Sequence, residues 1–206
     1  MAEPLVATER TTVRRRAERG RFDRALAYAI LDEAYVAHVG FVVDGSPRVL
    51  PMTFGRIDDV LYLHGAVGNA MLRAANGAEV CVTVTLLDGL VLARAAMHHS
   101  MNYRCVVLYG RAERVDDHIE KRRAFDSVVE GSRTGRSTEA RPANDSELRR
   151  TFVLRLAIAE GSVKVRTGGP VDDPDDLDLP VWAGVIPLAL VAGDPVRDGL
   201  PSAGGA

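Results

Sequence analysis

The stretch "VAHVGFVVDGSPRVLPMTFGRIDDVLYLHGA", residues 36–66, decides the fold class of this chain. Its apolar residues follow the two-residue period of strands, and the pattern predicts three strands. The turn sequences "DGSP" and "RIDD" join them as hairpins. Pro51 lies inside the second predicted strand, where it cannot donate a ladder hydrogen bond. We therefore expect one side of that strand to be unpaired, as is common where a ligand or another chain approaches.

Outside this stretch, strands outnumber helices, and most strands follow one another with short loops. The sequence "LDGL" is expected to separate two strands within residues 79–96. A helix is expected over 23–35, with Asp23 as its N-cap. Further helices are expected at 65–78, 116–132 and 146–150, and further strands at 104–115, 151–167 and 181–190.

This order of elements predicts a mainly β, α+β protein: an antiparallel sheet closed into a barrel, with helices on its outside. The alternation of strands and helices typical of doubly wound folds is absent. The sequence contains neither a GxGxxG motif after a first strand nor a P-loop, which excludes nucleotide binding of those kinds.

The composition is that of an ordinary globular protein, with 206 residues, 47% hydrophobic and 26% charged. A formal net charge of −2 gives no global argument for binding nucleic acid. The run "ERTTVRRRAERGRFDR" is rich in arginine, and it suits either a solvated arm, a strip packed on a partner or a nucleic-acid contact. Cys81 and Cys105 lie in apolar runs, which favours reduced thiols in a cytoplasmic protein.

The chain has no apolar segment near its beginning that resembles a secretory signal, and no apolar run of the ~18 residues that a membrane span needs. We expect a cytoplasmic protein that binds neither membrane nor nucleic acid. Three parts are expected: a basic arm over 1–22, one domain over 23–188, and a mobile tail over 189–206 that is rich in glycine and proline.

The stretch "AMHHSMNYRC", residues 96–105, gathers polar side chains between two apolar runs. His98 and His99 are neighbours, so in a strand they point to opposite faces and cannot readily hold one ion. No CxxC or HExxH pattern is present, and we expect no metal site. Ser100 has a neighbouring histidine but no GxSxG motif, so a hydrolase is not indicated.

A second polar stretch, "HGAVGNAMLRA" at residues 64–74, lies at a predicted strand-to-helix junction. The first amides of such a helix are unpaired, and together with the helix dipole they favour a phosphate. Arg73 follows about one turn later. A plain turn explains the glycines of this stretch equally well, so both interpretations stay open.

Four strings together resemble the pyridoxamine 5′-phosphate oxidase-like, FMN-binding split barrels, in the flavin-nucleotide-binding subgroup related to nitroimidazole reductases. The resemblance extends over roughly residues 23–188. The strings are "VGFVVDGSPRVLPMTFGR", "LYLHGAVGNAMLRA", "VCVTVTLLDGLVLARAAMHHSMNYRCVVLYGRAERV" and "KVRTGGPVDDPDDLDLPVWAGVIPL". The third of these strings is the most specific to the family.

The resemblance implies an antiparallel split β-barrel that forms a homodimer, with an FMN at each of two clefts between the subunits. The ring would lie against Arg48, Val49, Leu50, Pro51 and Met52. The phosphate would lie at His64, Gly65, Asn69 and Ala70, with Arg48 or Arg73 supplying charge. Polar contacts would come from Ser100, Asn102, Tyr103 and Arg104, and Trp182 would approach the flavin of the partner subunit.

Two departures from the oxidase pattern limit what the resemblance implies. The turn that resembles the phosphate site is Gly68, Asn69, Ala70, without the usual charge. The string "KVRTGG" lacks the histidine of the Arg-x-His pair that grips pyridoxal phosphate, so pyridoxamine phosphate oxidase activity is not expected. The implied function is an FMN-dependent oxidoreductase acting on an unknown small molecule.

Alternatives to that function stay open. They are a flavin-binding protein without turnover, or the same fold with deazaflavin F420 or haem; the arginine- and alanine-rich composition resembles that of high-GC bacteria, where F420 occurs. His99 is the candidate proton donor, although a packed histidine explains it as well. Alternation along a strand places Ser100, Asn102 and Arg104 on one face, which we expect to meet FMN.

Overall fold

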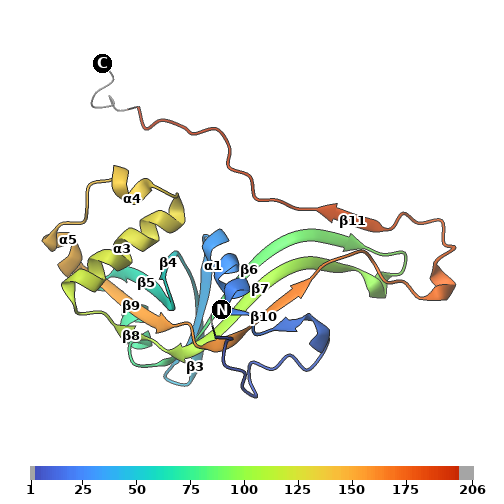
Figure 1. Cartoon of the computed structure of the whole chain (residues 1–206), viewed down its shortest axis with the longest axis horizontal. Coiled ribbons are helices and arrows are strands. Elements are labelled where there is room, and N and C mark those ends of the chain that lie inside the picture. The colour runs from blue at the N-terminus through green and yellow to red at the C-terminus, as the bar shows by residue number, and fades with distance from the viewer. Residues whose placement is uncertain (1–2, 200–206) are drawn as a thin grey trace.

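The structure is a computed structural model, and it describes residues 3–199. Two antiparallel sheets form its framework (Figure 1). The larger sheet has the order β1 (Gly20–Arg21), β10 (Glu160–Arg166), β7 (Ser100–Arg111), β6 (Glu79–Leu92), β2 (Ala37–Val43), β3 (Ser46–Met52), with β11 (Gly184–Pro187) also paired to β6. The smaller sheet has the order β4 (Phe54–Ile57), β5 (Val60–Ala66), β9 (Thr151–Ala157), β8 (Glu113–Arg114).

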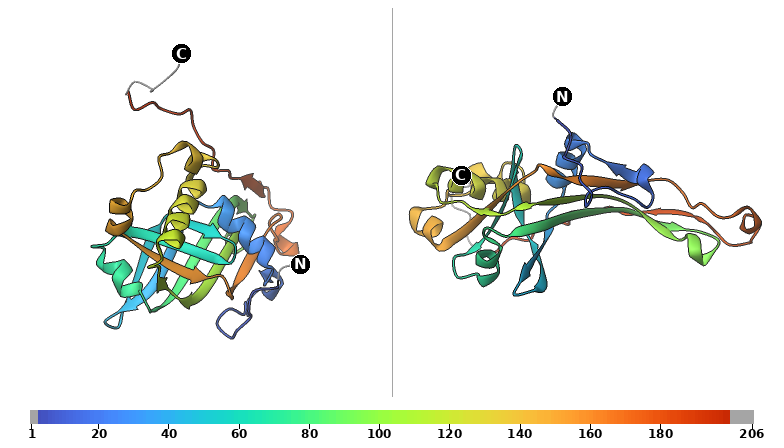
Figure 2. Two further views of the ribbon diagram at one scale, coloured as in Figure 1. Left: turned by 60° about the vertical axis from the view of Figure 1, so that its left-hand side comes forward. Right: turned by 90° about the horizontal axis from the view of Figure 1, so that it is seen from below.

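Helices cover the outside of these sheets, as Figure 2 shows from two further directions. The α-helices are α1 (Arg24–Glu33), α2 (Ala70–Ala75), α3 (His118–Ser132), α4 (Arg136–Glu139) and α5 (Asp145–Arg150), and the 3₁₀ turns are η1 (Ala17–Arg19), η2 (Ala96–His98) and η3 (Pro174–Asp176). The predicted class, a mainly β split barrel with peripheral helices, is confirmed, but the two sheets do not close into one barrel.

The stretch over residues 36–66 forms four strands instead of the predicted three. The predicted second strand is interrupted at Thr53, where the chain leaves the larger sheet after β3 and enters the smaller sheet as β4. The "DG" turn is confirmed, because Asp44 (φ 49°) and Gly45 (φ 73°) both adopt the left-handed conformation that a tight hairpin needs. β3 is an edge strand, so the expected unpaired side at Pro51 is also confirmed.

The prediction that "LDGL" separates two strands is wrong. β6 continues through it as one strand of 14 residues, and the register shifts between Leu87 and Gly89 so that Asp88 forms a bulge. A bulge accommodates one extra residue without ending a strand, which is why the turn signal misleads here. The chain reverses only at η2, so His98 and His99 lie in a turn before β7.

One edge of β6 is shared by two strands that do not meet. β2 pairs with residues 81–83 of β6, and β11 pairs with residues 89–92. Between these two segments no strand of the described chain lies against this edge of β6. The split of the barrel therefore falls at residues 84–88. The carbonyl of Asp88 accepts a hydrogen bond from the Leu188 amide, and the backbone groups that face this edge at residues 84–87 are available to a ligand.

The core lies between the sheets and under α1. Asp23 caps α1 as predicted, accepting a 3.0 Å hydrogen bond from the Leu26 amide, and the apolar face of α1 buries Ile30 and Leu31. α3 packs against β4 so closely that a Cβ on Gly55 would lie 2.1 Å from Ser127 Oγ. The fold thus depends on a glycine where helix and strand meet.

The two cysteines are free, in agreement with the prediction of reduced thiols. Cys81 and Cys105 are partly buried, and burial raises the pKa of both thiols. Neither group is therefore an activated nucleophile. No helix within residues 3–199 is long and apolar enough to cross a membrane.

The arginine-rich segment packs on its own chain. Leu5 is buried, Val6 forms a bridge with Glu160, and β1 pairs with β10. Arg10 forms ion pairs with both Glu79 and Glu160. The segment therefore satisfies the backbone groups at the edge of β10 instead of extending freely into solvent.

The ends of β6 and β7, with β11, project from the body of the molecule, and the chain after β11 runs back beside the body as an extended segment (Figures 1 and 2). Leu190, Val191 and Val196 on this segment are 85%, 79% and 95% exposed. Residues 200–206 of the predicted tail lie outside the described residues, and the boundary at residue 189 stays a prediction.

Candidate functional site

A cavity of about 640 Å³ lies at the split of the barrel, and we call it the Arg104 cavity. Its walls are the end of α1, the unpaired edge of β6 and the segment after β11. The lining residues are Glu33, Ala34, Tyr35, Val36, His38, Thr85, Leu86, Leu87, Asp88, Arg104, Leu188, Ala189 and Leu190. The cavity combines apolar walls with a few polar groups, as is usual for sites that bind a cofactor ring.

Arg104 is the only cation in this cavity among the described residues, and two carboxylates balance it. Its guanidinium lies 2.5 and 2.8 Å from the carboxylate oxygens of Glu33 and 2.8 Å from Asp88 Oδ1. The hydrogen bonds from Arg104 lower the pKa of Glu33, so this carboxylate is ionised at neutral pH. The guanidinium of Arg104, a predicted polar contact, is therefore already paired with two carboxylates in this structure.

The five residues expected to lie against a flavin ring, Arg48 to Met52, follow one another along β3. Pro51 stands directly opposite His38 in the β2–β3 pair, and directly opposite residues of an antiparallel pair share a face. His38 lines the Arg104 cavity. None of the five predicted residues lines the cavity itself, so the predicted ring-binding strand is connected to it only through His38 of the neighbouring strand.

The expected phosphate site lies elsewhere, at the β5–α2 turn. Asn69 uses its own side-chain oxygen to accept hydrogen bonds from the amides of Met71 and Leu72, at 3.0 and 3.2 Å. The buried Nδ1 of His64 has no hydrogen-bond partner, and burial lowers the pKa of this imidazole, which favours its neutral form. Among the residues expected at this turn, Gly65 and Ala70 carry no charge, and Arg73 remains as the cation.

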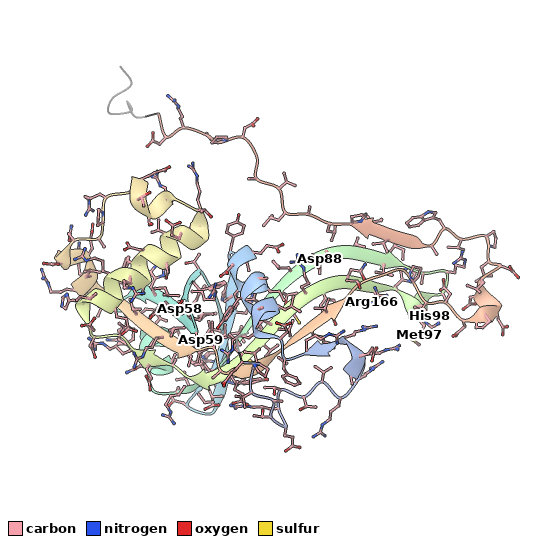
Figure 3. The ribbon with its side chains drawn as sticks, in the orientation of Figure 1. Asp58, Asp59, Asp88, Met97, His98 and Arg166 are labelled. Carbon is pink, nitrogen blue, oxygen red and sulfur yellow. The ribbon has the colours of Figure 1, made fainter. Side chains whose placement is uncertain are left out.

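A second cavity, about 580 Å³ in volume, lies near the projecting end of β7, and we call it the arginine pocket. It brings the arginine-rich segment, the η2 turn and the end of β10 together. The lining residues are Arg15, Arg16, Arg19, Met97, His98, His99, Ser100, Lys164, Arg166, Val171 and Asp173. Figure 3 labels Met97, His98 and Arg166 at this end of the molecule.

The structure thus divides the predicted polar face of residues 100–104. Ser100 lines the arginine pocket and Arg104 lines the other cavity. Asn102 is buried and bonds to Gly168 and Arg166. Tyr103 is half-buried between Leu87 of β6 and Arg166 of β10, and Trp182 is 64% exposed just before β11.

One signal in the sequence pointed to the arginine pocket, the arginine-rich run over residues 9–24, but it did not indicate where this run lies in the fold. Sequence separation hides the pairing of β1 with β10, which brings Arg16 and Arg19 beside the histidines. Met97, His98 and Lys164 lack any motif, so only the tertiary structure identifies them as lining residues.

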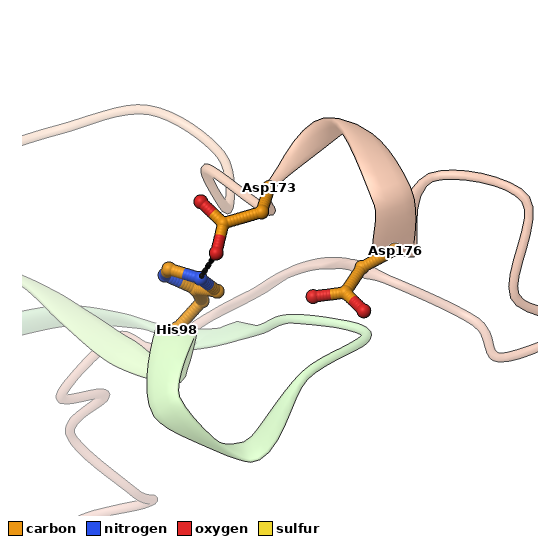
Figure 4. Close-up of side chains that lie close together, drawn as sticks. All are labelled: His98, Asp173 and Asp176. Atoms are coloured by element: carbon orange, nitrogen blue, oxygen red, sulfur yellow. Dashed lines mark hydrogen bonds and ion pairs between the residues drawn. The ribbon is translucent and has the colours of Figure 1, made fainter.

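One cluster of groups typical of metal ligands occurs within residues 3–199, formed by His98, Asp173 and Asp176 (Figure 4). His98 Nε2 lies 3.2 Å from Asp173 Oδ2, and the side chain of Asp173 is 73% exposed. The cationic residues of the arginine pocket stand beside this cluster and oppose the binding of a further positive ion. Within the cluster, the hydrogen bond is the one between His98 and Asp173.

Comparison with known proteins supports one family. The family model described as pyridoxamine 5′-phosphate oxidase matches residues 23–165. No curated protein sequence matches the chain.

Many solved structures resemble it, and three of them follow. The flavocytochrome Anf3 from Azotobacter vinelandii is 39% identical, with a TM-score of 0.88 over 98% of this chain and 96% of that chain. The FAD and haem binding protein from Mycobacterium smegmatis is 36% identical, with a TM-score of 0.80 over 89% and 93%. A putative 5-nitroimidazole antibiotic resistance protein from Bacteroides thetaiotaomicron is 28% identical, with a TM-score of 0.57 over 69% and 84%.

The family match extends over most of the chain and confirms the resemblance seen in the four sequence strings. The antiparallel split barrel agrees with this match. The chain therefore belongs to the pyridoxamine 5′-phosphate oxidase-like family.

Proposed function

We propose that this protein binds a flavin together with a haem and acts as an oxidoreductase that passes electrons between them. The observation that carries the proposal is the likeness along nearly the whole chain to two solved proteins, one a flavocytochrome and the other an FAD and haem binding protein. When bound, the flavin supplies chemistry in one- or two-electron steps and the haem supplies chemistry in one-electron steps.

The Arg104 cavity with the adjoining edge of β3 is the proposed site of the flavin ring. Leu86, Leu87 and Leu188 supply apolar walls, and His38 and Arg104 supply polar groups for the ring edge. The unpaired backbone of β6 at residues 84–87 adds donors and acceptors. In this arrangement the chain binds the ring, orients it and excludes water from it.

The family resemblance implies FMN, but the β5–α2 turn favours a flavin dinucleotide as the cofactor of this protein. A terminal phosphate at this turn would find its helix amides already bonded to Asn69 and a neutral His64 beside it. FMN and deazaflavin F420 remain the alternatives. A flavin-binding protein without turnover is the alternative to an enzyme.

We further propose that the protein is a homodimer. β3 has a free edge on which Val49 is 64% exposed, and the segment after β11 exposes Leu190, Val191 and Val196 to solvent in the single chain. Exposed apolar side chains on an extended segment, together with a free sheet edge, are typical of surfaces that a second copy covers.

The test is the identity of the bound groups. The full chain would be purified without added cofactor, the flavin released by heat and weighed by mass spectrometry, and the haem measured as its pyridine complex. FAD and haem in equal amounts are expected. A colourless protein that takes up neither added flavin nor added haem would overturn the proposal, and FMN or F420 in the released fraction would correct the cofactor.

Turnover needs its own measurement. The reduced protein would be mixed with oxygen and with small-molecule acceptors, and both chromophores followed by absorbance. Repeated reoxidation is expected of an oxidoreductase. A protein that holds its flavin but completes no cycle with any electron donor would support the flavin-binding alternative.

A further inference from the structure

The arginine pocket carries a positive charge that its own residues do not neutralise. Five of its lining residues are cations and Asp173 is its one acid, which leaves four positive charges in excess. Within residues 3–199, the ion pairs of this lining join Arg19 to the exposed Glu18 and His98 to Asp173. The cations of the lining without a carboxylate in ion-pair distance are Arg15, Arg16, Lys164 and Arg166. Like charges repel one another, so such a cluster costs free energy unless an anion joins it.

Arg166 is the buried member of this cluster, with 8% of its surface exposed. Its guanidinium donates to three neutral oxygens, those of Asn102, Gly168 and Gly169. These bonds use three of the five N–H groups of the side chain, so donors remain for a ligand. Burial lowers the pKa of Arg166, which is the sign of a cation that lacks an opposite charge. Buried cations of this kind are typical of sites that bind an anion.

Arg16 adds an independent observation from the backbone. Its φ of 58° and ψ of 52° lie in the left-handed region, which residues with a Cβ rarely adopt. The η1 turn that follows places Arg16 and Arg19 together on the lining of the pocket. Strain of this kind persists where the surrounding structure enforces it, and it is enriched at ligand sites.

The remaining lining suits a polar ligand. Ser100 supplies a hydroxyl group, and His99 is oriented by the contact of 3.1 Å between its Nδ1 and the carbonyl oxygen of Ala95. The apolar residues Met97 and Val171 are 87% and 76% exposed, so they give the pocket no buried apolar wall. The guanidinium fork of arginine matches the oxygens of a phosphate group. The lining therefore favours a phosphate-bearing ligand.

The arginine pocket is separate from the Arg104 cavity. The two cavities share no lining residue. Lys164 stands directly opposite Cys105 in the β10–β7 pair, so these two side chains share one face of the sheet. Arg104 precedes Cys105 in β7 and projects from the other face. A ligand bound in the Arg104 cavity would have to pass around the sheet to reach the arginine pocket.

Most of the charge of the pocket also lies outside the matched family domain. The family model matches residues 23–165, and the lining residues beyond this range include Arg15, Arg16, Arg19 and Arg166. The pocket is likewise distinct from the β5–α2 turn, where the family resemblance implies a cofactor phosphate. It is therefore built largely by segments that flank the domain.

We propose that the arginine pocket binds a free small molecule that carries a diphosphate group, held by Arg16, Arg19 and Arg166. A single phosphate group carries a charge of about −1.5 to −2 at neutral pH, so two such groups are needed to balance the four excess positive charges. The inference goes beyond the proposed function, because it adds a ligand other than flavin and haem. The diphosphate of a flavin dinucleotide shares this chemistry, and the experiment separates the two sources.

The experiment titrates the full-length protein with sodium pyrophosphate and, separately, with inorganic phosphate in a calorimeter. Both titrations are made on the flavin-free protein and again after saturation with flavin dinucleotide. Pyrophosphate is expected to bind about tenfold or more tightly than phosphate, because it engages more of the arginines, and to bind equally in both forms. Equal affinities for the two anions would overturn the diphosphate. Binding to the flavin-free protein alone would assign the pocket to the dinucleotide and overturn the free ligand.

The pocket is tested with the double variant Arg16→Gln/Arg19→Gln against the control Arg14→Gln/Arg21→Gln. The control removes two charges from the same segment, but neither of its residues lines the pocket. The first pair is expected to weaken pyrophosphate binding by about tenfold or more and to reduce its salt dependence, with the flavin content unchanged. Equal weakening by both pairs would show a general attraction of charge and overturn the site.

Lys164→Gln gives a second variant at a side chain that is only partly buried, in case the double variant does not fold. It is expected to weaken pyrophosphate binding in the same direction, and unchanged binding would count against the site. Wild-type protein that binds no pyrophosphate would overturn this inference and leave the proposed function standing. A chain that binds pyrophosphate but takes up neither flavin nor haem would overturn the proposed function and support this inference.

Discussion

Arg166 donates a 2.5 Å hydrogen bond from Nη1 to the side-chain oxygen of Asn102, joining the buried ends of β10 and β7. Asn102 in turn donates from Nδ2 to the carbonyl of Gly168 at 3.1 Å. A residue that the family resemblance places against a flavin is therefore committed here to holding an arginine. This pair links the strand that carries Ser100 and Arg104 to the wall of the arginine pocket.

Asp172 is expected to fix the turn that carries His98 and His99. Its side chain is 1% exposed, and it accepts hydrogen bonds from the amides of Arg94 and Ala95. Asp172→Ala should lower the urea midpoint, because two amides lose their acceptor. The exposed Asp175→Ala serves as the control, and equal midpoints for both variants would contradict the assignment.

The same carboxylate predicts a pH dependence. Burial raises the pKa of Asp172, but the bonds from Arg94 and Ala95 outweigh it, and the net shift is downward. A lowered pKa in the folded state contributes stability that is present above the unfolded value of about 3.9 and is lost as the pH falls below it. Urea midpoints measured from pH 6 to pH 2, about two units to either side of that value, should fall less in Asp172→Asn than in the wild type.

Tyr62 should titrate later than an ordinary tyrosine. Burial and its hydrogen bond to Glu120 raise the pKa of Tyr62 to about 12. Because the folded-state pKa lies above the unfolded value of about 10, the stability from this phenol is complete below pH 10 and is lost as the pH rises toward 12. An ultraviolet titration should contain a late component that is absent in Tyr62→Phe; its persistence there would refute the assignment.

Gly55→Ala should destabilise the fold by about 1–3 kcal/mol. The new methyl group would lie 2.1 Å from Ser127 Oγ and 2.7 Å from the backbone nitrogen of Val128, so α3 would have to move away from β4. Gly68→Ala is the matched control, since nothing lies within 4 Å of a Cβ there. Urea unfolding of both variants gives the comparison, and a smaller loss at Gly55 than at Gly68 would be the contrary result.

Glu33→Gln should raise the midpoint potential of the bound flavin. The change leaves Arg104 paired with Asp88 alone, so the cavity gains positive charge, and positive charge favours the reduced, anionic flavin. Asp32→Asn is the control, because Asp32 pairs with Arg56 outside the Arg104 cavity. A spectroelectrochemical titration measures both, and an equal potential in the two variants would argue against this cavity as the flavin site.

The proposed homodimer predicts two kinds of monomeric variant. Val49→Asp on the free edge of β3 and deletion of residues 189–206 should each lower the mass measured by light scattering. Ile119→Asp is the control, since Ile119 is 73% exposed on α3, outside both β3 and the segment 189–206. Wild-type protein that is monomeric at micromolar concentration would remove the dimer from the proposal.

The sequence by itself determined the local elements and the family. The "DG" turn and the Asp23 cap are set by interactions between residues close in the chain, and the structure confirms both. The edge position of the strand with Pro51 followed from the chemistry of proline alone. The arginine run was visible too, although its place in the fold was not.

Only the tertiary structure decided which polar residues meet. The register of β6 against β7, with its bulge at Asp88, separates Ser100 from Arg104 into two cavities. The pairing of β1 with β10 brings Arg16 to His99 across more than eighty residues of chain. Contacts of this kind depend on the free energy of packing whole sheets, not on local preference, and a single sequence does not encode their geometry in any short pattern.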